Sequence, residues 1–204
     1  PGFGGSCFKK DILNLVYLSN FFNLPEVADF WEAVVTMNKW HQSRISKIVV
    51  KKLFGTVTGK QITILGFAFK ANTNDTRESA AIKICKDLLE EGAILVIHDP
   101  KVDEKQITLD LGIEPCELRT EYKKTNLDND EGKWQKCNDI YKSFDNSDAI
   151  LILTEWKEYT EIKWDLVSKL MRHPAWVFDS RSIIDRQKVK DAGINFWRVG
   201  DGVS

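Results

Sequence analysis

The sequence predicts an α/β protein in which a long central helix is followed by a doubly wound parallel sheet. Apolar residues recur at helical spacing between residues 11 and 54. From residue 60 onward, apolar runs of strand length alternate with helical stretches, and Gly92 closes one such stretch just before the next run. Strands that alternate with helices form parallel sheets through right-handed crossovers. These patterns together predict two helices followed by an open, helix-covered sheet.

The first predicted helix covers residues 11–22 and ends near Pro25. A second helix of about 28 residues follows from residue 26 to residue 54, which corresponds to ~42 Å at ~1.5 Å per residue. Its apolar residues, which include Trp31 and Trp40, occupy more than one face. A helix of this length and pattern favours packing against a second surface, so we expect the protein to self-associate through it as a homo-oligomer.

Buried strands are predicted after this helix, because several short runs are almost continuously apolar, as is typical of a parallel sheet. They cover residues 61–69, 93–98, 149–154, 175–178 and 195–199, and helices are expected at 77–91, 139–144, 162–171 and 185–192. Residues 116–137 are polar and charged and predict an exposed insertion loop. The chain thus divides into a helical part, residues 1–54, and a Rossmann-like domain, residues 55–204.

The composition is that of an ordinary globular protein, with 29 Lys and Arg residues, 30 Asp and Glu residues and a net charge of −1. This balance gives no general attraction to phosphate backbones or anionic lipid, so nucleic acid is not an expected partner. The longest apolar runs are far shorter than the ~20 residues of a membrane span, so no membrane partner is expected either. The 4 cysteines form no CxxC pair, which favours reduced thiols in a cytoplasmic protein and argues against a metal site.

The first candidate site is the segment from Gly2 to Asp11, in which glycines lead into Cys7 where the first helix is expected to begin. A thiol in a first helical turn lies at the positive end of the helix dipole, and Lys10 shares its face, so the thiolate is favoured. Asp11, one turn after Cys7, could hold or deprotonate a water molecule there. From the residues alone, a structural thiol is as good an interpretation of Cys7 as a nucleophile.

The second candidate site covers residues 66–79, where the chain leaves the first strand and enters a helix. Ligands of open α/β sheets bind at this edge, and Lys70 and Arg77 there could meet phosphate or carboxylate groups. The alternative is that Asp75 and Thr76 cap the helix and Arg77 is a solvated residue of its first turn. No GxGxxG follows this strand, so dinucleotide binding by this domain itself is not indicated.

Two further strand ends carry polar residues. Arg181 follows the predicted strand 175–178, and it could reach the same cleft or cap its own helix. His98 and Asp99 end the predicted strand 93–98, where ordinary turn chemistry is sufficient to explain them.

Together, the segments from Gly2 to Asp11 and from Gly66 to Ser79 closely resemble the UDP-glucose 6-dehydrogenases, and the resemblance runs across essentially the whole chain. It implies an NAD-binding domain at the N-terminus, a central dimerisation helix and a C-terminal UDP-sugar-binding domain. Only the last two are present here. The chain also opens at Pro1, without Met and inside a glycine-rich segment, so we expect it to be a fragment that is inactive alone.

The resemblance also implies a reaction and a role for each residue. UDP-glucose would be oxidised to UDP-glucuronate in two hydride transfers to NAD, with Cys7 forming a thiohemiacetal and then a thioester that Asp11 helps to hydrolyse. The implied substrate-binding residues are Gly2, Phe3, Gly4, Phe69, Lys70 and Arg181, and the implied cofactor-binding residues are Lys10 and Arg77. The alternative is a sugar-nucleotide-binding or dimerisation module without catalysis, although such a module has no need of a nucleophile.

Overall fold

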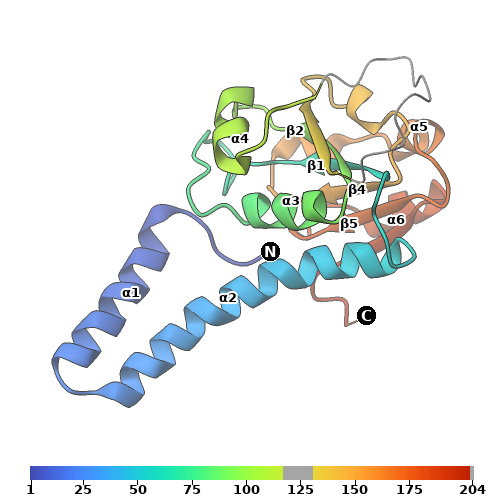
Figure 1. The fold of residues 1–204 in the computed structure, drawn as a ribbon. Helices are drawn as coiled ribbons and strands as arrows, with labels where there is room; N and C mark the ends of the chain where they lie inside the picture. The colour runs from blue at the N-terminus through green and yellow to red at the C-terminus, as the bar shows by residue number, and fades with distance from the viewer. Residues whose placement is uncertain (117–130, 203–204) are drawn as a thin grey trace.

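The computed structural model describes residues 1–116 and 131–202, which form a helical hairpin and an α/β domain (Figure 1). The domain contains a six-stranded sheet in the order β3-β2-β1-β4-β5-β6, and every neighbouring pair is parallel. Its strands are β1 (Gln61–Leu65), β2 (Ile94–His98), β3 (Lys133–Lys136), β4 (Ala149–Ile152), β5 (Trp176–Asp179) and β6 (Asn195–Arg198). The predicted α/β class with a doubly wound parallel sheet is confirmed.

Helices connect the strands and precede them. The α-helices are α1 (Ser6–Phe21), α2 (Pro25–Lys52), α3 (Ala80–Glu90), α4 (Glu104–Leu111), α5 (Trp164–Leu170) and α6 (Arg186–Asp191), and two short 3-10 helices are η1 (Lys142–Phe144) and η2 (Lys157–Glu161). The two predicted N-terminal helices are therefore present, with Pro25 in the first turn of α2. None of the helices within the described residues has the length and apolar character needed to cross a membrane.

The long helix α2 belongs to two parts of the molecule. Its C-terminal half packs on the α/β domain, where Ile45 and Val49 are completely buried in the core. Its N-terminal half pairs with α1 in an antiparallel hairpin that projects away from the domain (Figure 1). The hairpin therefore holds the N-terminal segment beside the sheet at one end and is solvent-exposed at the other.

The prediction of one exposed loop over residues 116–137 is wrong at its C-terminal end. Residues 133–136 form the edge strand β3, and the Trp134 side chain is fully buried, with its indole N–H donating to the Ile113 carbonyl (2.9 Å). A single buried residue between the polar residues Lys133 and Gln135 gives almost no apolar run, which explains why the sequence pattern missed this strand. Residues 117–130 lie outside the described residues.

Several predicted boundaries shift for local reasons. β1 ends at Leu65, because Gly66 adopts φ 93° and turns the chain away from the sheet. α3 begins at Ala80, because the Ser79 hydroxyl caps it by accepting the Ala81 N–H (3.3 Å). The alternative in which Asp75 and Thr76 cap this helix is therefore wrong. The predicted helix at 139–144 is only the short turn η1, and α4 was not predicted, because only Ile107 and Leu111 of it are buried.

Candidate functional site

The glycine segment at the N-terminus packs against the loop that leaves β1. The Gly5 N–H donates to the Arg77 carbonyl (2.9 Å). A Cβ atom on Gly4 would lie 2.6 Å from the Glu78 carbonyl oxygen, so this close approach requires glycine. The Phe69 ring lies against Gly5. The two segments that the sequence singles out therefore meet at the carboxyl edge of the sheet.

The reactive side chains of α1 lie beside this contact. Cys7 is the second residue of α1 and is exposed, with its sulfur 3.9 Å from the Ser6 hydroxyl. Lys10 and Asp11 follow in the next turn and are exposed too. Lys9 binds the Glu78 carboxylate with Nζ 2.7 and 2.8 Å from its two oxygens, which ties this first turn to the loop after β1. Cys7 is thus held at the helix end, where the dipole is positive, and stays accessible.

A residue that sequence analysis did not identify, Asn38, holds the start of the chain. Its side chain lies in the polar middle of α2, accepts the Phe3 N–H (2.9 Å) and donates to the Phe3 carbonyl (3.0 Å). The same amide oxygen lies where a Cβ on Gly2 would be. The segment Gly2–Gly4 is therefore fixed between α2 and the loop after β1. Asn38 is one of several polar residues in the middle of this helix, so the sequence gives no separate signal for this role.

The loop after β1 presents cationic side chains to solvent. Lys70 is exposed, with its ammonium group 5.3 Å from the centre of the Phe69 ring. The Arg77 guanidinium pairs with both carboxylate oxygens of Asp75 (2.7–3.1 Å), and these hydrogen bonds lower the pKa of Asp75 and raise that of Arg77. Arg77 belongs to this loop, not to the first turn of α3 as the alternative held.

Arg181 reaches the same edge from the end of β5. Its Nη2 donates to the Phe69 carbonyl (3.0 Å) and its Nε to the Leu153 carbonyl (2.7 Å), while Glu155 lies 3.2 Å from Nε. Burial lowers the pKa of Arg181. The alternative that it caps its own helix is wrong, because Asp185 caps α6. One nitrogen of the guanidinium is thus hydrogen-bonded to the main chain of the loop that carries Phe69.

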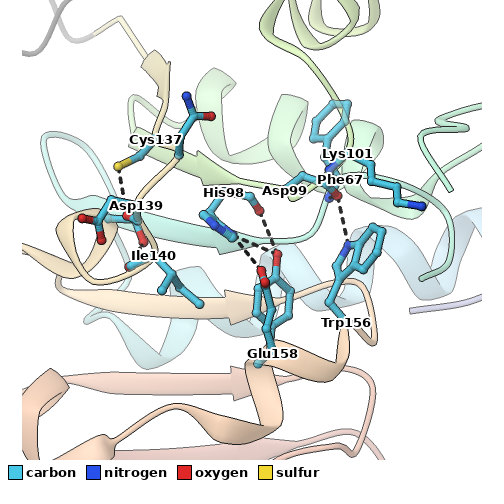
Figure 2. A network of polar contacts seen from close by, with 12 residues as sticks. Phe67, His98, Asp99, Lys101, Cys137, Asp139, Ile140, Trp156 and Glu158 are labelled. Carbon is cyan, nitrogen blue, oxygen red and sulfur yellow. Dashed lines mark hydrogen bonds and ion pairs between the residues drawn. The ribbon is translucent and has the colours of Figure 1, made fainter. Parts of the chain in front are cut away.

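Turn chemistry is sufficient to explain Asp99 from the sequence, but in the structure this residue connects three strand ends (Figure 2). Its side chain is 3% exposed and accepts N–H groups from the loops after β1 and β2 and from the Trp156 indole after β4. Beside it, the Tyr159 hydroxyl lies 3.1 Å from His98 Nδ1. Within the described residues, no group of three His, Cys, Asp or Glu side chains is placed to hold a metal ion.

Comparison with known proteins gives consistent matches. Residues 63–186 match the UDP-glucose/GDP-mannose dehydrogenase family, UDP binding domain. The chain is 43% identical over 199 residues to the UDP-glucose 6-dehydrogenase of Drosophila melanogaster, covering 98% of this chain and 40% of that protein. It is 42% identical to the enzyme of the same name from Caenorhabditis elegans, covering 98% and 39%. The chain therefore spans about two fifths of the length of these relatives.

Solved structures agree with this match. A UDP-glucose dehydrogenase from Pyrobaculum islandicum superimposes with a TM-score of 0.68 at 25% identity, covering 96% of this chain and 38% of that one. A UDP-D-ManNAc dehydrogenase from Pyrococcus horikoshii gives 0.69 at 23% identity, covering 98% and 39%, which shows the shared fold. Since the matched UDP binding domain makes up more than half of the sequence, the chain belongs to the UDP-glucose/GDP-mannose dehydrogenase family.

Proposed function

We propose that this chain is the C-terminal part of an NAD-dependent UDP-glucose 6-dehydrogenase, which oxidises UDP-glucose to UDP-glucuronate in the cytoplasm. The observation that carries the proposal is the contact between the Cys7 turn of α1 and the loop after β1, which brings a nucleophile to the ligand-binding edge of a UDP binding domain. The identity of more than 40% to enzymes of that name supports the same substrate.

In this proposal, the sugar nucleotide lies against the loop after β1. Lys70 supplies an exposed ammonium group for the diphosphate, and Phe69 supplies an apolar ring beside it. The backbone of Gly2, Phe3 and Gly4 lines the sugar, which places C6 near Cys7. Arg181, which the resemblance assigns to the substrate, contributes through the Phe69 carbonyl as well.

Cys7 carries the covalent chemistry of this proposal. The C6 alcohol first loses a hydride and its hydroxyl proton, which gives an aldehyde. The Cys7 sulfur adds to this aldehyde, and the former carbonyl oxygen takes up a proton to complete a thiohemiacetal. Loss of a hydride from C6 and of the hydroxyl proton converts this adduct into a thioester. Asp11 orients or deprotonates the water that attacks the thioester, which releases the carboxylate and regenerates the thiol.

The exposed cations Lys10 and Arg77 fit a dinucleotide that approaches from outside this domain. The Arg77 carbonyl accepts the Gly5 N–H, which places this residue beside the Cys7 turn, and the side chain of Arg77 is 69% exposed. When bound, the nicotinamide accepts the hydrides. The loop after β1 lacks a GxGxxG, so the main dinucleotide-binding surface would come from a preceding domain, as the greater length of the relatives suggests.

We also propose that the hairpin of α1 and α2 self-associates. Its exposed apolar side chains include Phe30, Met37 and Trp40, which are 57–63% exposed between residues 30 and 40 of α2. Sedimentation should show a dimer, and Met37→Glu should raise its dissociation constant more than tenfold, because it buries a charge. The control is Lys47→Glu on the other half of α2, and equal effects of the two variants would argue against this interface.

The proposed function is tested with substrate and NAD. We expect this chain alone to bind UDP-glucose weakly by calorimetry and to form no NADH, since half of the cleft is missing. The complete enzyme should form two NADH for each UDP-glucuronate. Lack of UDP-glucose binding by both forms at millimolar ligand would contradict the proposal, and NADH formation by this chain alone would contradict the predicted inactivity.

A further inference from the structure

The backbone that leaves β1 is fully engaged by side chains and main chain from elsewhere. Each backbone N–H from Gly66 to Phe69 donates a hydrogen bond. Each carbonyl from Phe67 to Phe69 accepts a hydrogen bond from a side chain. The N–H partners are the carbonyls of His98 and Asp75 and the carboxylate of Asp99, and the carbonyl partners are the Ser79 hydroxyl (2.7 Å), the Thr154 hydroxyl (2.6 Å) and Arg181 Nη2 (3.0 Å). Phe67 and Ala68 are buried, so their backbone groups need partners, and most of the partners in this segment are side chains from elsewhere in the chain.

Asp99 is the group that this segment shares with its neighbours (Figure 2). Its Oδ2 accepts the N–H groups of Phe67 (2.7 Å) and Ala68 (3.0 Å) and the Trp156 indole N–H (3.3 Å). Its Oδ1 accepts the N–H groups of Lys101 (2.9 Å) and Val102 (3.0 Å). Both oxygens are therefore needed as acceptors, one for the loop after β1 and one for the loop after β2.

The buried Asp99 side chain therefore holds Phe67 and Ala68, which come just before the residues that would meet the ligand. Phe69 and Lys70 follow Ala68 without interruption, and they are exposed or half-buried while Asp99 is buried. A binding loop that is held before the ligand arrives loses less conformational freedom on binding. Asp99 does not reach the surface, so any effect it has on a ligand must pass through the loop.

We propose that Asp99 is a positioning residue for UDP-sugar binding, acting through the N–H groups of Phe67 and Ala68 to fix Phe69 and Lys70. The proposal rests on the proposed function of this edge as the UDP-sugar site. Asn at position 99 would keep only one acceptor oxygen for the two loops, and its NH2 group would face backbone N–H groups, which cannot accept a hydrogen bond. The two loops then compete for one oxygen, so the loop after β1 is held less tightly while the sheet stays intact.

The test measures binding of UDP and UDP-glucose to the complete enzyme by calorimetry, without NAD. Asp99→Asn should raise both dissociation constants about tenfold or more, and amide exchange at Phe67 and Ala68 should accelerate. The matched control is Asp103→Asn, which removes a nearby aspartate that caps α4 and does not touch the loop. A second control, Val189→Ala in α6, destabilises the same domain away from this edge.

The outcomes separate the two proposals. Wild-type protein that binds neither UDP nor UDP-glucose overturns the proposed function and, with it, this inference. If the wild type binds and Asp99→Asn binds equally well, or if Val189→Ala weakens binding as much for the same loss of Tm, the positioning role alone is overturned. Should Asp99→Asn not fold, Thr154→Val removes only the hydroxyl that holds the Ala68 carbonyl, and we expect at least threefold weaker binding.

Discussion

The start of the hairpin and the carboxyl edge of the sheet hold their functional groups in opposite ways. On α1, Cys7, Lys10 and Asp11 are exposed. At the sheet edge, the loop before Phe69 is held from several strand ends by buried groups such as Asp99. The binding edge is thus built within this chain, whereas the reacting groups face outward, where another part of the protein can cover them. In the proposed function, most of the binding groups lie at the sheet edge and the reacting groups lie at the start of the hairpin.

The two halves of α2 repeat the contrast within one helix. Phe30 and Met37 in the first half are 62% and 63% exposed, while Ile45 and Val49 in the second half are completely buried. Both halves carry large apolar residues, so the difference comes from what lies beside them. The first half leaves large apolar side chains exposed, as the proposed self-association requires, and the second half is part of the core.

The largest expected effect is the loss of turnover in Cys7→Ser. A serine hydroxyl is a poorer nucleophile and a poorer leaving group than a thiol, so uronate formation by the complete enzyme should fall by about 10³-fold or more. Affinity for UDP-glucose should stay within about twofold, because binding belongs to the sheet edge. Cys116→Ser, at a half-buried thiol, is the control. Near-normal uronate production by Cys7→Ser would return Cys7 to a structural role.

Asp11→Asn should affect only the hydrolytic half of the reaction. Loss of a group that orients or deprotonates water slows such a step by about 10² to 10⁴-fold. The thioester should then accumulate on Cys7 and appear as a mass increase of the intact protein during turnover. Glu26→Gln, which removes an exposed carboxylate from α2, should form no adduct. A slower Asp11→Asn enzyme without any adduct would show that Asp11 acts elsewhere.

The contrast within α2 is measured by stability. Ile45→Ala should lower the free energy of unfolding by about 2 to 5 kcal/mol, because it leaves a cavity in the core. Met37→Ala should change it by less than about 0.5 kcal/mol, because the side chain is exposed. Urea unfolding at low micromolar protein gives both values. Equal losses would mean that the first half of α2 is already covered.

The sequence could predict the parts of the fold whose residues have a regular pattern. Strands β1, β2, β4 and β5 are almost entirely buried and mostly apolar, so their runs predict them. Strand β6 is less buried, but Phe196 and Trp197 still give it a short apolar pattern. Strand β3 lies at the edge and buries Trp134 between polar residues, so its pattern is weak.

The contacts that build the site join residues far apart in the chain, and no local pattern reports them. Asn38 holds Phe3, which lies 35 positions earlier, and Asp99 holds Phe67, which lies 32 positions earlier. Each of these residues can be read in the sequence. Which residue it contacts depends on how the helices and strands pack together in the folded chain. The candidate side chains could therefore be found in advance, whereas the buried groups that orient them could not.

The smallest expected effect is on the pH dependence of stability. It involves two histidines, His98 at the sheet edge and His41 on α2. His98 is buried, and burial lowers its pKa. In the unfolded chain a histidine has a pKa of about 6.5, so below this pH the unfolded state binds a proton that the folded state does not yet accept. The free energy of unfolding should therefore fall as the pH drops below about 6.5.

His98→Gln should make this fall shallower, because it removes one of the groups responsible. Burial also lowers the pKa of His41, so His41→Gln should act in the same direction, and the two effects should add because the sites are independent. The Glu158 carboxylate lies 3.8 Å from His98 Nδ1 and would partner the protonated ring, so Glu158→Gln should make the fall steeper. Urea unfolding between pH 7 and pH 5 measures these slopes. If the free energy of unfolding of His98→Gln depends on pH as in the wild type, the ring has the same pKa in the folded and unfolded states. Burial of His98 would then not destabilise the protein in acid.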